Sequence, residues 1–547
     1  HEKKMKNNIL SGLTVGIIAL PLSMALAIAT GVPPQLGLYT AIVAGFFAAI
    51  FGSSKVNISG PTAAFIVILI PIVHDFGVSG LLICGLLSGF ILVIAGFLKL
   101  GTLIEIVPYP VTVGFTSGIA VVIATYQIKD FFGLSIENFE GHYLDKIFLI
   151  FSNFNTFKPA ELIVGATTLF ILIFWQKTKS KIPSALIALG FITVVVYIAN
   201  IYFPQLNIST IYSTFDYKIG NLEGQGIPPI PLHFELPWSY LNVDQINFDL
   251  FYKLLPHSIA IAILGALESL LCAVISDGMT GHKTDPNKEL IGQGITNIIV
   301  PFFGGIPATA AIARTVVNVK AGATSKISSV IHSLFILASI SFLATYLSFL
   351  PMAALSALLL MVAWNMSEIK HFINIVKVAP GNDILILLTC FFLTVLIDMQ
   401  VAVAIGMGLA SILFIKKTID LHSIELTNNR TNIIHPDIPD NISIYDINGP
   451  MFFGAAQSAL KTLLNVNENT SVVILNMKNV PIIDMTGIIT LESIVENFES
   501  KNKKLVFCGL SERILKKLEK AHFHFDGVTL KTFDNLHDSI NYSKSVT

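Results

Sequence analysis

The stretch VNISGPTAAF at residues 56–65 has a near copy, GGIPATAAI, at residues 304–312. Both place Gly and Pro before a Thr/Ala segment that turns apolar, so each predicts extended backbone that leads into a helix. The two stretches lie at matching places in the two halves of a hydrophobic chain. Broken segments at corresponding places are the best sequence pointer to a transporter's binding site. Irregular backbone is tolerated at membrane depth only where it is buried in protein or lines a cavity.

A helix that begins inside a membrane directs free N–H groups and the positive end of its dipole at the cavity, which favours an anion. The Thr hydroxyls of both stretches could bind an oxyanion, although Thr also commonly begins helices. The Phe would either wall the cavity or pack in the core. The candidate substrate-binding residues of these stretches are Thr62, Ala63, Phe65, Ala308 and Thr309.

The composition indicates a membrane protein. Of 547 residues, 53% are hydrophobic and 13% are charged, against roughly 25% charged in soluble proteins. The net charge of −1 argues against a nucleic-acid partner. The 4 cysteines show no paired spacing, so neither a disulfide framework nor a metal site is expected.

About fourteen apolar segments precede residue 416, some of them half-length or broken. We expect a transmembrane domain over residues 1–421, with two repeats of seven segments at about 9–203 and 251–415. The division falls in the longest polar connection, at about 204–250. The expected segments are 9–29, 36–52, 56–73, 78–98, 104–128, 159–176, 182–203, 251–279, 288–304, 307–318, 326–350, 352–366, 382–397 and 399–415.

The lysines support an even number of spans. If the N-terminus is cytoplasmic, most lysines fall in loops expected inside, and the long connection at 204–250 has Lys218 as its only Lys or Arg. Residues 422–441 then form a linker. Residues 442–547 alternate strand and helix patterns and predict a small cytoplasmic α/β domain. We expect a multi-pass protein of a bacterial inner membrane with both termini in the cytoplasm.

The chain resembles the SulP (sulfate permease) anion transporters, and its C-terminal region resembles their STAS domain. The resemblance rests on Ile18–Ala25, Ser59–Thr62, Leu264–Leu271 and Ala313–Thr315, in this order and over essentially the whole chain. It implies a polytopic α-helical fold built as a seven-plus-seven inverted repeat, which nucleobase transporters share. It also implies a core domain that moves against a gate domain, and a homodimer.

Arg314 is expected about two turns into a half-helix that starts near Pro307. A charged Arg inside a membrane segment is a functional hypothesis by default, and the resemblance implies a cation near the substrate here. Alternatively, the side chain reaches the cytoplasm or pairs with a carboxylate. The resemblance also places Ser23, on the interrupted first helix, at the substrate cavity.

Glu268 lies in an otherwise apolar run, where desolvation favours a neutral carboxyl group, so it is a candidate proton carrier. In members of the family that use sodium, the residues that resemble this position are an Asp and a Thr one helical turn later. Here the pair is Glu268 and Cys272, and a thiol is a poor ligand for a hard cation. Proton coupling is therefore favoured over a sodium site at Glu268 and Cys272. A salt bridge between Glu268 and Arg314 is the alternative.

In the C-terminal domain, residues 484–487 read Asp-Met-Thr-Gly where related bacterial regulators have Asp-Ser-Ser/Thr-Gly. Met485 has no hydroxyl group, so phosphorylation at that position is impossible, and Thr486 is a weak substitute. We therefore expect this domain to dock a cytoplasmic protein or to assist assembly.

No enzyme signature or ATP-binding loop is present in the sequence, so transport must use ion gradients. The expected function is secondary active import of a small oxyanion by alternating access, with sulfate first and bicarbonate or a C4-dicarboxylate next. The coupling ion is H⁺, with Na⁺ less favoured, and no cofactor is expected. The expected partners are the anion, membrane lipid and a second copy of the chain. A sodium-coupled bicarbonate symporter, a nucleobase transporter, an anion channel or exchanger, and a receptor remain open.

Overall fold

The computed structural model describes residues 2–102, 107–178, 180, 182–397, 399–420, 423–426, 438–525 and 529–547. They divide into two compact units, His1–Gly408 and Leu409–Thr547. Two expectations lie partly outside the described residues: the start of the segment at 104–128, and most of the linker at 422–441.

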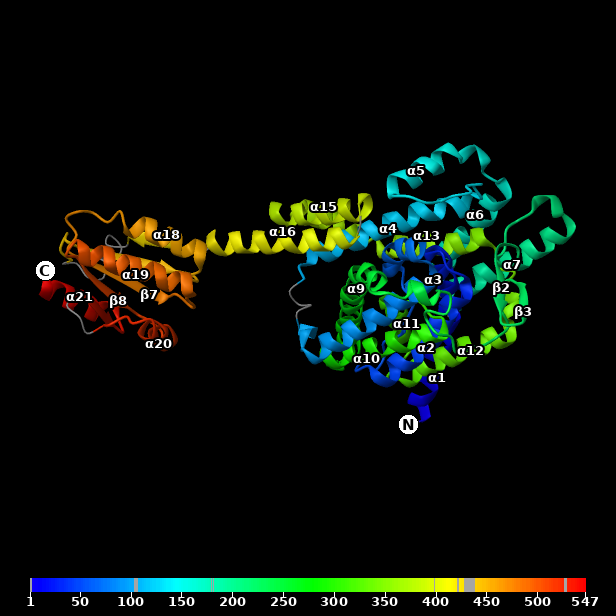
Figure 1. Cartoon of the computed structure of the whole chain (residues 1–547), viewed down its shortest axis with the longest axis horizontal. Helices are drawn as coiled ribbons and strands as arrows, with labels where there is room; N and C mark the ends of the chain where they lie inside the picture. Colours follow the sequence, from blue (N-terminus) through cyan, green and yellow to red (C-terminus); the bar gives the residue numbers. More distant parts are fainter. Residues whose placement is uncertain are drawn as a thin grey trace. The chain divides into compact units, whose positions relative to one another are not determined.

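The first half of the membrane region is helical apart from one short strand (Figure 1). The helix α3 is broken at Gly77, where the backbone is not helical and φ is 67°. It therefore covers two of the expected segments, which meet at this glycine. The elements are α1 (Glu2–Thr30), α2 (Pro34–Phe51), β1 (Ser59–Gly60), α3 (Ala63–Phe97), α4 (Tyr109–Phe132), α5 (Tyr143–Ser152), α6 (Pro159–Gln176) and α7 (Ser184–Tyr202).

The second half follows a polar connection that holds the short helix α8 (Ile211–Thr214) and a hairpin of β2 (Asp216–Ile219) and β3 (Leu222–Gln225). Its strand and helices repeat the order of the first half. They are α9 (Phe248–Thr280), α10 (Pro286–Ile299), β4 (Thr309–Ala310), α11 (Ile312–Lys320), α12 (Ile327–Leu347), α13 (Met352–Met366), α14 (Ile369–Val378), α15 (Gly381–Leu396) and α16 (Met399–Asp420).

Within the described residues, ten helices are long and apolar enough to cross a membrane. When α3 is divided at Gly77 and the shorter α10, α11 and α15 are included, each half supplies seven segments. The seven-plus-seven expectation is thereby met.

The membrane helices pack as two groups. One contains α1, α2, α3, α9, α10, α11 and α12, and the other contains α4, α6, α7, α13, α14 and α15. Within the first group, helices approach closely at glycines: a Cβ on Gly37 of α2 would lie 2.0 Å from the Ser23 carbonyl oxygen of α1. This grouping corresponds to the expected core and gate.

The C-terminal unit contains a five-stranded sheet in the order β5-β6-β7-β8-β9. The strands β6 to β9 are parallel and β5 is antiparallel to β6. Strand β5 lies in the range expected to be a linker, and its pairing with β6 makes it part of the sheet. The elements are β5 (Ser423–Leu426), β6 (Ile442–Asn448), α18 (Phe453–Leu463), β7 (Val472–Asn479), α19 (Met485–Ser500), β8 (Lys504–Cys508), α20 (Glu512–Lys520), β9 (Leu530–Phe533) and α21 (Leu536–Val546).

Side chains of the central strand β7 alternate between two apolar clusters. Val473 and Leu475 belong to one cluster, and Val472 and Ile474 belong to the other. Because successive strand residues point to opposite faces, both faces of the sheet are covered.

We expect Leu475→Ala to destabilise this domain by about 2–5 kcal/mol, because the fully buried side chain would leave a cavity. The control is Ile489→Ala on α19, whose side chain is 51% exposed and should change stability by no more than about 0.5 kcal/mol. The measurement is urea-dependent hydrogen exchange of β7 in the whole protein. Equal protection in the two variants would contradict this description of the core.

Candidate functional site

The two broken stretches meet in space. Strand β1 pairs with β4 in antiparallel register, with Ser59 opposite Ala310 and Gly60 opposite Thr309. The Ala311 amide also donates to the Ile58 carbonyl at 2.8 Å. Helix α3 begins directly after β1, and α11 begins directly after β4. The pairing therefore brings two helix N-termini to one place.

Neither helix N-terminus is capped by the side chain at its N-cap position. Thr62 has the extended N-cap conformation (φ −129°), but its hydroxyl accepts no hydrogen bond from the first turn of α3. That hydroxyl is buried and has no partner within the described residues. Ala311 precedes α11 and has no capping atom. In the first turn of α3 the Phe65 amide donates to the Thr62 carbonyl at 3.3 Å. The other N–H groups at the start of the two helices have no N-cap side chain as partner within the described residues, so they are the donors that a ligand could use.

Arg314 lies in the first turn of α11, not two turns into it as expected. The helix begins only at Ile312 because the residues before it pair as β4. The guanidinium is 3% exposed, and its Nη2 donates to the Pro61 carbonyl. Its Nε and Nη1 have no partner within the described residues. The side chain makes no ion pair there, so the salt bridge with Glu268 is not formed.

The remaining candidate hydroxyls differ in availability. Ser23 is fully buried on α1, and its Oγ has no partner among the described residues. The Thr309 hydroxyl is engaged: it donates to the Gly265 carbonyl at 3.0 Å and lies 2.5 Å from the Ser269 Oγ. Ser23 and Thr62 can therefore offer a hydroxyl to a ligand, whereas Thr309 holds β4 against α9.

The three remaining candidates are apolar residues that lie at or next to the two helix starts: Ala63, Phe65 and Ala308. Phe65 is 1% exposed and packs on Gly265, where an added Cβ would lie 3.3 Å from the ring. Ala63 is the first residue of α3, and Ala308 is buried directly before β4. The Phe65 side chain is thus packed in the protein interior and is not exposed to a cavity in this structure.

Glu268 is 8% exposed on α9 and has neither a hydrogen bond nor an ion pair within the described part of the chain. The Cys272 thiol, one turn later, points to the Asn57 Oδ1 at 3.6 Å. The Glu268 carboxyl group is thus held by no other described side chain, which leaves it a candidate for ion coupling.

Two polar side chains that were not predicted from the sequence hold the backbone next to β1. The Thr315 Oγ1 accepts from the Ile58 amide at 2.9 Å, and the Asn318 Nδ2 donates to the Val56 carbonyl at 2.8 Å. Both belong to α11, so the second half fixes the backbone of the first. Their polar character inside a segment expected to lie in the membrane was the available signal.

The model of the sulfate permease family matches residues 5–389, and that of the STAS domain matches residues 434–539. The chain belongs to the sulfate permease family. This family consists of anion transporters rather than enzymes. One relative matches over nearly the whole chain. It is the "Putative sulfate transporter YvdB" of Bacillus subtilis, which is 38% identical over 96% of this chain and 98% of its own length. The "Bicarbonate transporter BicA" of Picosynechococcus is 27% identical over 95% of this chain and 91% of its own length.

Solved structures agree with the fold. The murine Slc26a9 anion transporter in its inward-facing state superposes with a TM-score of 0.84 over 100% of this chain and 92% of that one, at 18% identity. The transmembrane domain of a cyanobacterial bicarbonate transporter BicA matches with a TM-score of 0.61 over 74% of this chain and 98% of that domain, at 26% identity.

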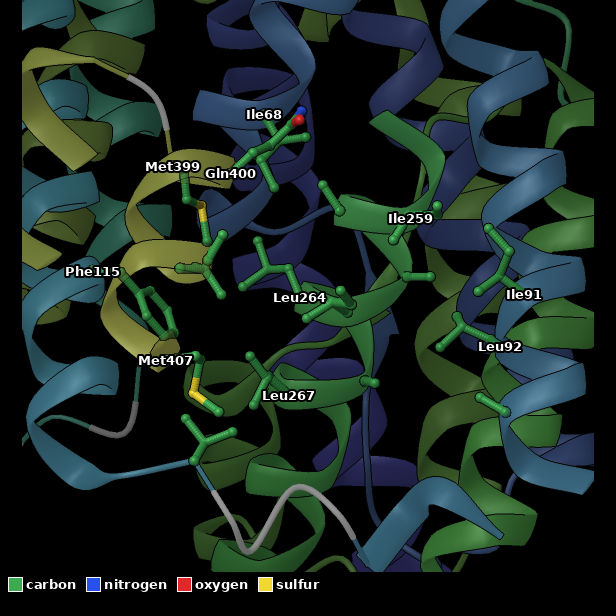
Figure 2. A pocket seen from close by; sticks show the side chains of 18 of the residues that line it. Ile68, Ile91, Leu92, Phe115, Ile259, Leu264, Leu267, Met399, Gln400 and Met407 are labelled. Atoms are coloured by element: carbon green, nitrogen blue, oxygen red, sulfur yellow. The ribbon is translucent and has the colours of Figure 1, made fainter. Parts of the chain in front are cut away.

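A large cavity in this permease does not suit an anion. It has a volume of about 590 Å³ and lies beside α9, with further walls from α3, α4, α10 and α16 (Figure 2). Among the described residues that line it, Gln400 has the only polar side chain, and the Gln400 Nε2 lies 3.0 Å from the His257 Nδ1. Because the described lining holds no cation and little polarity, the cavity suits apolar groups, and the paired strands β1 and β4 remain the candidate place for an anion.

We expect Gly60→Ala to lower anion uptake at least tenfold, because the new Cβ would lie 2.7 Å from the Arg314 Nη1 and displace the guanidinium. The neighbour is the end of a flexible side chain, so folding should be preserved. The control is Gly190→Ala on α7, where a Cβ meets nothing within 4 Å. Uptake of radiolabelled sulfate and bicarbonate into proteoliposomes measures both. Equal uptake by the two variants would show that Arg314 need not occupy this position.

Proposed function

We propose that this protein is a secondary active transporter of a small oxyanion, which works by alternating access. Sulfate is the first choice, and bicarbonate or a C4-dicarboxylate follows. The observation that carries the proposal is the buried Arg314 guanidinium beside two helix N-termini. Among the described residues, two of its nitrogens have no partner and neither N-terminus has a side-chain cap.

A buried cation without a counter-charge is costly, and a bound anion would remove that cost. The N–H groups at the start of α3 and α11 would add donors whose dipoles also favour negative charge. The free hydroxyls of Thr62 and Ser23 would complete the set of donors. A neutral nucleobase would leave Arg314 uncompensated, so the site favours an oxyanion over a base.

The relatives support the order of substrates. One carries the name of a putative sulfate transporter at 38% identity, and another carries the name of a bicarbonate transporter at 27%. The site offers charge and hydroxyl groups rather than a fixed shape, so both oxyanions fit its chemistry. A bicarbonate transporter is therefore the second candidate.

We further propose that protons drive transport through Glu268, whose carboxyl group has no fixed partner in the described chain. Sodium is less favoured, because the nearby thiol of Cys272 is a poor ligand for a hard cation. Both termini would lie in the cytoplasm of a bacterial cell, with the chain a homodimer in the inner membrane. The STAS domain would dock a cytoplasmic protein.

Competitive uptake into proteoliposomes tests the substrate class. Labelled sulfate uptake would be measured with an excess of unlabelled sulfate, bicarbonate, fumarate or uracil, under an imposed pH gradient. Inhibition by the oxyanions and not by uracil is expected. Inhibition by uracil alone would favour a nucleobase transporter, and dissipative flux without accumulation would favour a channel.

We expect Arg314→Ala to weaken anion binding thirtyfold or more, since loss of a buried charge that pairs with a ligand costs about 2–5 kcal/mol. Lys320→Ala, an exposed position at the end of the same helix, is the control and should retain wild-type affinity. Anion-dependent thermal stabilisation of the purified proteins reports affinity without requiring transport. Wild-type stabilisation of a folded Arg314→Ala variant would falsify the role of this residue.

We expect Glu268→Gln to bind and exchange the anion but to lose pH-driven accumulation. An anion near the carboxyl group disfavours its ionisation, so protonation and anion binding should reinforce each other. The amide mimics the protonated form. Glu161→Gln, at a 2% exposed carboxylate on α6, is the control and should keep its pH response. Uptake is measured across a pH series with and without sodium. Strict sodium dependence, or an unchanged pH response in Glu268→Gln, would reject proton coupling at this residue.

A further inference from the structure

One face of α10 carries three polar side chains at four-residue intervals: Glu289, Gln293 and Asn297. Each is at most 2% exposed. Residues four apart lie above one another on a helix, so the three form a single row. Such a row inside a membrane helix is expensive unless every member has partners. Each of the three has partners on the chain segments that form the candidate site, and only the buried Gln293 Oε1 has none within the described residues.

The first two members hold the segment that leads into α3. The Glu289 Oε2 accepts from the Ser53 and Ser54 amides at 2.7 and 2.9 Å. The Gln293 Nε2 donates to the Ser59 Oγ of β1 at 2.9 Å and to the Glu289 Oε1 at 3.1 Å. The row thus fixes the first broken stretch both before β1 and within it.

The third member holds the segment that leads into α11. The Ala308 amide donates to the Asn297 Oδ1 at 2.9 Å, and the Asn297 Nδ2 donates to the Ala308 carbonyl at 2.8 Å. The same Nδ2 also donates to the Gln293 carbonyl at 2.9 Å. The amide side chain therefore takes the place of a paired strand residue next to β4.

We propose that Gln293 and Asn297 are positioning residues for the anion site. They attach both broken stretches to one rigid helix, and so fix where the paired strands β1 and β4 lie against α10. That placement sets the direction of the two helix N-termini, and it sets where Arg314 meets the Pro61 carbonyl. The inference rests on the proposed function, because it concerns the affinity of the same site.

The alternative is that these amides stabilise the fold alone. A matched control separates the two roles: Gln127 on α4 is also a buried amide, is 7% exposed, and accepts from the Ser356 Oγ at 3.2 Å. It belongs to the other helix group. Loss of either kind of amide should lower stability, whereas only loss of the α10 amides should change anion affinity.

The experiment compares Gln293→Met, Asn297→Leu and Gln127→Met in proteoliposomes under saturating and limiting anion. We expect the α10 variants to raise KM roughly tenfold or more with a much smaller change in maximal rate, because displacement of a binding group by about 1 Å can cost up to a hundredfold. Gln127→Met should keep the wild-type KM. If Asn297→Leu does not fold, Asn297→Asp keeps the size and the acceptor for the Ala308 amide but loses both donors.

Anion-dependent thermal stabilisation of each purified variant provides a second measure of affinity. Weakened stabilisation in the α10 variants alone supports the positioning role. Wild-type affinity in Gln293→Met and in a folded Asn297 variant overturns it, as does an equal rise of KM in Gln127→Met. If the wild-type protein neither binds nor transports any oxyanion, the proposed function fails, which is a distinct outcome.

Discussion

Backbone polar groups at membrane depth must find partners inside the protein, because lipid offers none. In this chain the constraint falls on two short segments that are neither helix nor long strand. Each solves it with the other: β1 pairs with β4, and the amide after β4 donates to the carbonyl before β1. Side chains of α10 and α11 satisfy further groups on both sides. The backbone groups of the two strands are thereby paired, while no N-cap side chain within the described residues caps the helices that follow them.

The same pairing makes the candidate site a joint product of the two halves. Arg314 comes from the second half, yet its Nη2 donates to Pro61 of the first half. Gly60 is needed beside it, because any side chain there would meet the guanidinium. Neither half could hold the charge in this position alone. A chain with two related halves can therefore have a single asymmetric charge at its centre, supplied by one half and positioned by the other.

Much of the fold could be predicted from the sequence, because its signals are local. Gly and Pro marked the two broken stretches, and apolar runs marked the membrane spans. Strand patterns that alternate with helix patterns marked the α/β domain that contains β6, β7 and β8. The depth of Arg314 was misjudged, because whether residues 309–310 extend as strand depends on a partner about 250 residues away. Strand β5 was missed because its extended form also depends on a partner strand, although that partner, β6, lies only about 20 residues later.

The site residues divide in the same way. Arg314 and Glu268 stand out in any apolar run because charge in a membrane is costly. Asn297 and Gln293 do not, because an amide within a helix acquires meaning only from the backbone it contacts. Their four-residue spacing after Glu289 was visible, but it indicated only a shared face. Their contacts to Ser59 and Ala308 required the fold.

Charge balance connects the choice of anion to the state of Glu268. Arg314 contributes one positive charge, and two helix N-termini contribute about half a charge each, so the proposed site offers about two positive charges. Sulfate neutralises both when Glu268 is protonated. Bicarbonate carries one negative charge and neutralises only half of that charge. Either anion disfavours ionisation of Glu268, and the divalent anion does so more strongly than the monovalent one. A single arrangement of residues can thus bind either anion and differ in the number of protons that accompany it.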